Sequence, residues 1–131
     1  MTSPYPQLPI LMVDDEMQTL NSFDFVLRSA SMNHMIRCQD SRKVMVIFSN
    51  QEIEVMLLDL SMPYVSGEEL LSMVTKDFPE VPIIVVTGSN DVETAVRCMK
   101  SGAFDYMVKP VEGWEKSLQY IGRSISWLGC L

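Results

Sequence analysis

The fold of this chain is decided by residues 54–67, which read EVMLLDLSMPYVSG. The apolar letters VMLL have the length of a short buried strand and end on a carboxylate, Asp59, ahead of a loop with Pro63 and Gly67. A single Asp after an apolar run ordinarily marks only a turn. If the run is a central parallel strand, however, Asp59 lies at its carboxyl end, where open parallel sheets bind ligands.

Further apolar runs end on polar side chains in the same way: residues 10–13 before Asp14 and Asp15, residues 82–86 before Thr87, and residues 103–108 before Lys109. Runs without alternation are typical of parallel strands that are covered on both faces. The segments between the runs carry apolar residues at helical spacing. The sequence therefore predicts one α/β domain, with a parallel sheet between two layers of helices.

The remaining elements are predicted from caps and helix breakers. Residues 33–39 form a weakly alternating edge strand. Ser41 is expected to cap a helix that runs to about Asn50, although the letters VMVIF within it are also strand-like. The other helices are expected at residues 17–30, from Ser66 to before Pro79, at residues 91–100 with a stop at Gly102, and at residues 112–128.

Composition excludes several classes of protein. The chain has 131 residues, of which 47% are hydrophobic, enough for one core without disulfide or metal staples. Its net charge of −7 argues against nucleic-acid binding. The three cysteines are widely spaced and form no CxxC pair, so a reducing compartment is expected rather than a zinc site. One histidine, His34, allows neither a histidine metal cluster nor a Ser-His-Asp triad.

No segment is predicted to enter a membrane, because no apolar run approaches the ~18 residues that a spanning helix needs. The chain also opens without the pattern of a signal peptide, and we expect a cytoplasmic protein. Residues 1–9 contain three prolines and are expected to form a disordered leader. The folded domain is expected at residues 10–128, followed by a tail at residues 129–131.

The polar strand ends suggest a common chemistry. In a parallel sheet they meet at one edge, which brings three carboxylates, the Thr87 hydroxyl and the Lys109 ammonium into one crevice. Clustered carboxylates suit a hard cation such as Mg²⁺. Asp59 is then a candidate nucleophile toward a phosphoryl group, whose oxygens Lys109 and Thr87 would stabilise. Asp14 and Asp15 also have a simpler interpretation, as acids at the positive end of the following helix.

Four motifs in order, VDDE, LLDLSMPYVSG, VVTGSNDVETAV and GAFDYMVKP, make the chain resemble the receiver domain of two-component response regulators. The resemblance covers about residues 9–127, and residues 91–110, DVETAVRCMKSGAFDYMVKP, are similar to receivers of NtrC-type enhancer-binding regulators. It implies a flavodoxin-like (β/α)5 fold with strand order 2-1-3-4-5 and a receiver domain at residues 10–128. It also implies a phosphoacceptor with a regulatory role, linked to transcription, rather than an enzyme.

By matching position, the resemblance assigns the chemistry of the site. Asp59 is the phosphoacceptor, Asp15 is the direct Mg²⁺ ligand, Asp14 holds the metal chiefly through water, and the Ser61 backbone carbonyl completes the protein ligands. Ser61 and Ser89 flank the path of the hydrolytic water and are expected to tune phosphoryl lifetime.

The resemblance also assigns a switch and partners. Thr87 is the switch hydroxyl, Tyr106 the aromatic switch, and Lys109 the phosphoryl-binding cation before an expected cis Lys109–Pro110 bond. The phosphodonor is a sensor histidine kinase. The output is a further domain or a partner protein, and the face formed by residues 91–127 is where two copies are expected to pair.

Alternative functions remain open at this point. A degenerate receiver would serve only as a protein-protein scaffold. A phosphatase of the haloacid dehalogenase type would use similar groups, but it has a DxD motif, and Ser61 occupies the second acidic position here. A flavin-binding module of similar fold needs a phosphate-binding loop after the first strand, where this chain has acids.

Overall fold

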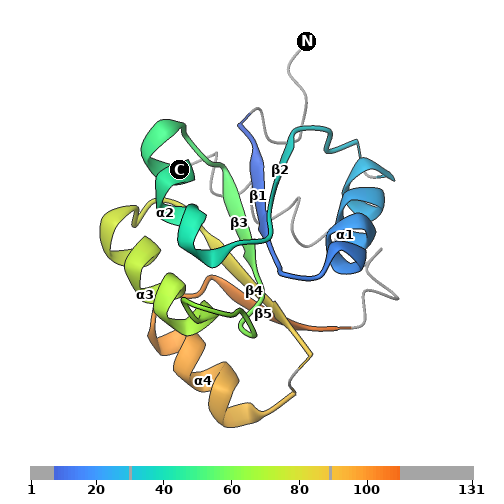
Figure 1. The fold of residues 1–131 in the computed structure, drawn as a ribbon. Helices are drawn as coiled ribbons and strands as arrows, with labels where there is room; N and C mark the ends of the chain where they lie inside the picture. Colours follow the sequence, from blue (N-terminus) through green and yellow to red (C-terminus); the bar gives the residue numbers. More distant parts are fainter. Residues whose placement is uncertain (1–7, 30, 89, 110–131) are drawn as a thin grey trace.

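The computed structural model describes residues 8–29, 31–88 and 90–109. Within these residues, parallel strands form a single sheet in the order β2-β1-β3-β4-β5 (Figure 1). The strands are β1 (Ile10–Val13), β2 (Met35–Cys38), β3 (Val55–Leu58), β4 (Ile83–Thr87) and β5 (Asp105–Val108). The predicted α/β fold and strand order are thus confirmed.

Helices follow the strands along the chain: α1 (Met17–Ser29), a 3₁₀ turn η1 (Ser41–Lys43) that continues into α2 (Val44–Asn50), α3 (Gly67–Asp77) and α4 (Val92–Lys100). Figure 1 shows α1 on one side of the sheet and α2, α3 and α4 on the other. The expected leader and the expected last helix at residues 112–128 lie outside the described residues, apart from the end of the leader at Leu8 and Pro9.

Each buried strand supplies side chains to two apolar layers, because successive side chains of a strand point to opposite faces. In β1, Ile10 and Met12 pack in a cluster with Leu20, Phe23 and Leu27 of α1. The alternate strand residues join the other cluster, which α2, α3 and α4 complete: Leu11, Val13, Met56, Leu58, Val44, Phe48, Leu70, Leu71, Val74 and Cys98. Burial on both faces explains why the strand sequences are apolar without alternation.

The helix α4 buries little of its surface against the described core. Asp91 caps its first turn by accepting a hydrogen bond from Glu93 N at 3.3 Å. Within its nine residues, all of them described, Cys98 is the only buried side chain. Its apolar residues Val92, Val96 and Met99 are instead 74%, 45% and 47% exposed. The predicted helix is present, but its apolar stripe faces away from the described core.

The cap expected at Ser41 was wrong. The side chain of Asp40 caps η1 by accepting a hydrogen bond from Arg42 N at 3.0 Å. The Ser41 hydroxyl is buried and bonds to the loop before α3 instead, so it is not available to its own helix. The strand-like letters VMVIF lie in helix α2, whereas the cap predicted at Ser66 is present.

The described part of the chain contains no helix with both the length and the apolar character that crossing a bilayer requires.

Candidate functional site

The site lies at the carboxyl ends of the strands. Asp14 directly follows β1, Asp59 follows β3, Thr87 ends β4 and Lys109 follows β5. Backbone hydrogen bonds continue the sheet into the site, since Asp59 N donates to Val13 O at 2.9 Å and Lys109 N donates to Thr87 O at 2.8 Å. The fold therefore places these four side chains at one edge of the sheet, and the sheet hydrogen bonds hold the backbone that carries them.

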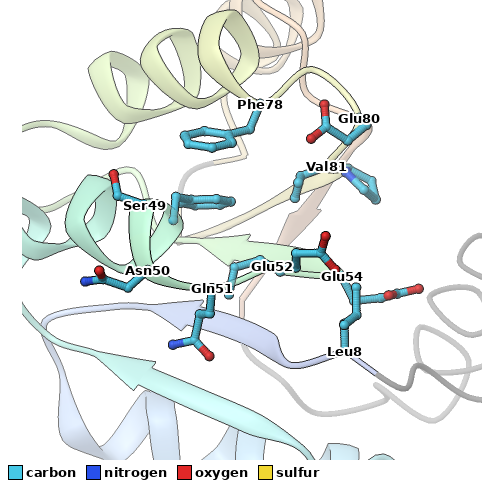
Figure 2. A pocket seen from close by; sticks show the side chains of 12 residues that line it. Leu8, Ser49, Asn50, Gln51, Glu52, Glu54, Phe78, Glu80 and Val81 are labelled. Carbon is cyan, nitrogen blue, oxygen red and sulfur yellow. The ribbon is translucent and has the colours of Figure 1, made fainter.

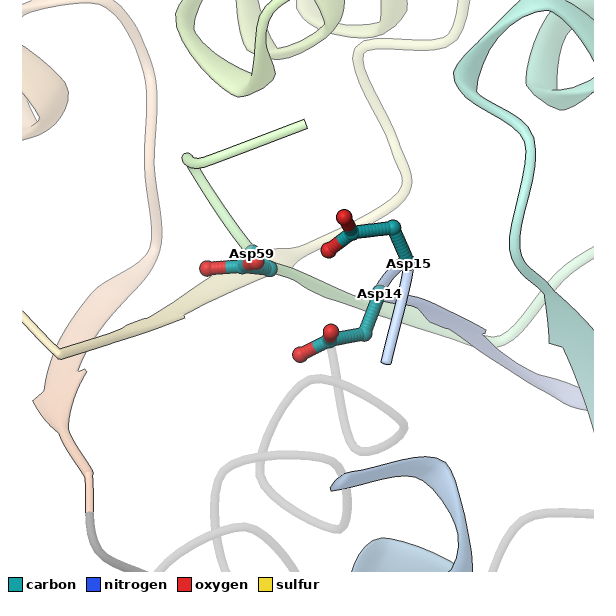
Figure 3. Close-up of side chains that lie close together, drawn as sticks. All are labelled: Asp14, Asp15 and Asp59. Carbon is teal, nitrogen blue, oxygen red and sulfur yellow. The ribbon is translucent and has the colours of Figure 1, made fainter. Parts of the chain in front are cut away.

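Three carboxylates converge there, as Figure 3 shows. Asp14, Asp15 and Asp59 each offer one oxygen, and these oxygens all lie within 4.8 Å of one another. Asp14 is 0% exposed, Asp59 is 4% exposed and Asp15 is open to solvent. Closely spaced carboxylate oxygens repel one another and are the donors that hard divalent cations prefer, so this donor set fits Mg²⁺.

A largely buried ion pair offsets part of this negative charge. Lys109 Nζ donates to Asp14 Oδ2 at 2.8 Å and lies 3.7 Å from Asp59 Oδ1. The other oxygen of Asp14 accepts a hydrogen bond from Glu16 N at 2.9 Å. Burial acts to lower the pKa of Lys109, but the bond to Asp14 and the charge of Asp59 outweigh it, so the pKa is raised and the ammonium is retained.

The Asp59 carboxyl has an unusual acidity. Burial, as the main cause, together with the negative charge of Asp14, raises its pKa to about 6. The Lys109 charge and a hydrogen bond from the Ser61 backbone N–H act in the opposite direction without cancelling the rise. Without a cation, the site therefore disfavours the ionised form of Asp59. Above pH 6 it is nevertheless mainly a carboxylate.

The other predicted site residues differ in how far they are buried, and some lie outside the described residues. Thr87 is 2% exposed, whereas Tyr106 is half-buried against the cluster that α2, α3 and α4 cover. Ser61 is exposed, two residues after Asp59. Ser89 and Pro110 lie outside the described residues, so the expected Lys109–Pro110 bond and one of the two lifetime positions stay predictions. The same holds for the part of the face 91–127 beyond Lys109.

The loop after Asp59 folds back onto its own start. Gly67 N donates to Leu60 O at 3.1 Å. A Cβ atom at Gly67 would lie 2.4 Å from Leu60 Cα and 2.5 Å from Asp59 O, so only glycine allows this approach. The last residue of the quoted stretch thus closes the loop that carries Ser61.

Residues of the preceding helical segment hold the same loop, and no local sequence pattern indicates this role. Ser41 Oγ donates to Pro63 O at 2.6 Å and accepts from Val65 N at 3.0 Å. The Arg42 guanidinium lies 3.8 Å from the centroid of the Tyr64 ring. These contacts join positions more than 20 residues apart, which local spacing and capping patterns do not report.

A cavity of about 620 Å³ lies at the opposite end of the sheet, before β3 and β4 (Figure 2). Its lining includes the stacked rings of Phe48 and Phe78, with Glu52, Glu54 and Glu80 around them. None of the predicted site residues lines it. It is therefore separate from the carboxylate cluster.

Comparison with known proteins identifies the family. Residues 10–117 match the response regulator receiver domain family. The DNA-binding transcriptional regulator NtrC of Proteus hauseri is 29% identical over 120 residues, which are 89% of this chain and 24% of that protein. The chain spans about a quarter of the length of the curated relatives it matches.

Solved structures of receiver domains have the same fold as this chain. A CheY-like receiver domain protein from Methanospirillum hungatei JF-1 has a TM-score of 0.85 at 26% identity, covering 95% of this chain and 98% of that one. The beryllofluoride-activated NtrC4 receiver domain dimer has a TM-score of 0.78 at 26% identity, covering 89% and 98%. With the family match over most of its length, the chain belongs to the response regulator receiver domain family.

Proposed function

We propose that this chain is a phosphorylation-dependent switch of a two-component system, in which Asp59 accepts a phosphoryl group from a sensor histidine kinase. One observation carries the proposal. Asp59 is a buried carboxylate at a strand end, with two further carboxylates and one ammonium around it. Membership of the receiver family supports it.

Asp14, Asp15 and Asp59, with the backbone carbonyl of Ser61, would hold Mg²⁺. Both oxygens of Asp14 already accept hydrogen bonds, from Glu16 N and Lys109 Nζ, whereas Asp15 is open to solvent. This difference supports Asp15 as the direct ligand and Asp14 as a ligand through water. Bound Mg²⁺ would supply positive charge against the oxygens of the transferring phosphoryl group.

The protein groups have distinct tasks in the transfer. An oxygen of Asp59 attacks phosphorus, forming an O–P bond as the P–N bond to the kinase histidine breaks, and the imidazole leaves with the electron pair. Lys109 is close enough to move from Asp14 toward the new phosphoryl oxygens. The buried Thr87 hydroxyl donates to one of them. The result is an aspartyl-phosphate that this domain makes and loses without acting on other substrates.

The phosphoryl group then shifts a conformational equilibrium. The arrangement in which Thr87 bonds to phosphate is favoured, and Tyr106, half-buried two residues before the end of β5, turns toward the space that the Thr87 loop leaves. Ser61 and Ser89 tune how long the phosphoryl group survives. A purely scaffolding receiver has no need for this complete set of groups.

The output face includes α4 and continues to residue 127. Its exposed apolar residues Val92, Val96 and Met99 suit contact with a second copy or an output domain. The dimer of the NtrC4 receiver and the role of NtrC as a transcriptional regulator support pairing and control of transcription as the output.

The test is the intact mass of the chain after incubation with acetyl phosphate, with and without Mg²⁺. We expect a gain of about 80 Da, one phosphoryl group, that requires both Mg²⁺ and Asp59. Asp59→Asn should show no gain, whereas Asp105→Asn, which removes a carboxyl from β5 away from the cluster, should gain as the parent does. If the parent shows no gain and also forms no stable beryllofluoride complex, the switch proposal is wrong and a scaffold remains.

A further inference from the structure

The loop between Asp59 and α3 contains a backbone conformation that does not suit its residue. Tyr64 has a φ of +72°, in the left-handed region that side chains with a Cβ rarely adopt. Tyr64 is 72% exposed, so the core does not hold its ring in place. Such a conformation persists only when neighbouring contacts enforce it.

Ser41 supplies the first of these contacts. Ser41 is only 2% exposed, and its hydroxyl donates to Pro63 O at 2.6 Å and accepts from Val65 N at 3.0 Å. These two bonds fix the peptide groups on both sides of Tyr64. Since Ser41 opens η1, directly before the buried Val44, the loop is tied to a packed element.

Arg42 supplies the second contact. Its Cζ lies 3.8 Å from the centroid of the Tyr64 ring, a cation–π distance. Two hydrogen bonds to Asp40, from Nε at 3.0 Å and from Nη2 at 2.9 Å, orient the guanidinium over the ring. Ser41 and Arg42 therefore act on one loop residue from two directions.

We propose that Ser41 and Arg42 form a clamp that positions the phosphoacceptor loop for Mg²⁺ binding. The clamp is the pair of Ser41 bonds together with the Arg42–Tyr64 stack, and the inference rests on the proposed function. The base of the loop is closed by Gly67 N bonding to Leu60 O. If the clamp is lost, relaxation of Tyr64 is therefore confined to residues 61–66, which include the proposed carbonyl ligand Ser61.

The first test is the Mg²⁺ affinity of the unphosphorylated chain, measured by calorimetric titration. Ser41→Ala should weaken Mg²⁺ binding by about three- to tenfold, the range expected for losing one or two net hydrogen bonds. Arg42→Met, which keeps the length of an exposed side chain but removes the cation, should weaken it by about two- to fourfold. In both variants the Val65 amide should exchange faster with solvent.

A matched control separates positioning from stability. Ser66 lies in the same loop, and its hydroxyl accepts from Glu69 N at 3.2 Å as the cap of α3. Ser66→Ala should lower stability to a similar extent because it also removes a serine hydrogen bond. Its Mg²⁺ affinity should stay within about twofold of the parent.

A second variant tests the role of the strained residue. Glycine at this position adopts a positive φ without strain, so the loop of the Tyr64→Gly variant depends less on the clamp for its conformation. In that background, Ser41→Ala should cost less Mg²⁺ affinity than it does in the parent. A general loss of stability would instead give the same cost in both backgrounds.

Several results would overturn the clamp. One is parent-like Mg²⁺ affinity in folded Ser41→Ala, and another is an equal loss in Ser66→Ala. If Ser41→Ala does not fold, Arg42→Met decides, since its side chain is exposed. If the parent itself binds no Mg²⁺, the metal-binding part of the proposed function is wrong. The clamp is then judged by whether Ser41→Ala shifts the Ser61 amide resonance in metal-free protein.

Discussion

Lys109 hydrogen-bonds to Asp14 and not to Asp59. Its Nζ lies 2.8 Å from Asp14 Oδ2 and 3.7 Å from Asp59 Oδ1, and the second distance exceeds that of a hydrogen bond. The lysine is thus the counter-charge of a fully buried carboxylate, while its field still reaches Asp59. Two roles follow, one in stability and one in the proposed chemistry.

Lys109→Met should destabilise the fold. It leaves the Asp14 carboxylate, which is 0% exposed, without its cation, and removing one partner of a buried pair costs about 3 kcal/mol or more. The measurement is the free energy of unfolding in urea, followed by circular dichroism at pH 7.5. The control is Arg97→Met, which breaks the exposed pair with Glu68 and should cost much less, because solvent screens exposed ion pairs. Equal costs for the two variants would contradict the assignment.

Asp59→Asn should stabilise the metal-free fold at neutral pH. The pKa of Asp59 is about 6 in the folded chain, against an ordinary value of 3.8 for an aspartate side chain. The folded state therefore holds more protons than the unfolded state between these values, and stability falls as the pH rises through that window. Asparagine removes this loss, which is on the order of 3 kcal/mol for a pKa raised from 3.8 to about 6.

The measurement is urea unfolding of both proteins in EDTA at several pH values. The advantage of Asp59→Asn should grow from pH 4 to pH 7 and then stay constant. Glu80→Gln, an exposed change in a turn, should show no such growth. A constant difference between Asp59→Asn and the parent across the range would show that Asp59 titrates normally.

Thr87→Ala should separate phosphorylation from switching. In the proposed chemistry the hydroxyl is not the nucleophile, so the mass gain with acetyl phosphate should persist. The change in α4 amide resonances on adding beryllofluoride should largely disappear, because the bond proposed to favour the active arrangement is missing. Thr87→Ser retains the hydroxyl and should restore the response. A full response in Thr87→Ala would remove Thr87 from the switch.

Val96→Glu should weaken self-association without weakening the fold. Val96 is 45% exposed on α4, so stability should change by about 0.5 kcal/mol or less. Sedimentation of the beryllofluoride-treated chain should show less dimer than the parent. Val46→Glu on α2, where valine is 59% exposed, is the matched control and should leave association unchanged. A parent-like dimer in Val96→Glu would place the interface elsewhere.

Strand positions could be predicted because each buried strand is an apolar run that ends on a polar residue. VMLL before Asp59 is an example, and the strand bounds agree with that run. The placement of Asp14, Asp59, Thr87 and Lys109 at one edge follows from topology alone, since parallel strands end on the same side. Topology does not specify which charged side chains pair with each other. The preference of Lys109 for Asp14 over Asp59 depends on side-chain geometry.

The incorrect prediction of a helix cap at Ser41 shows what local sequence patterns cannot resolve. Asp40 and Ser41 are both good helix caps by residue type, and the sequence offers no local reason to choose between them. The choice is made by the loop before α3, 22 to 24 residues away, which takes the Ser41 hydroxyl as donor and acceptor. Tyr64 is similar, because a tyrosine carries no signal for a positive φ.

The small buried share of α4 bears on how the domain diverges in evolution. Cys98 is the only α4 side chain buried among the described residues, so packing against the described core does not constrain the outward residues of the helix, and substitutions among them leave that core intact. The strand ends, by contrast, are fixed by the sheet and by the pairing of Lys109 with Asp14. Descendants of this sequence can therefore acquire new binding partners through α4 while the residues at the strand ends stay the same.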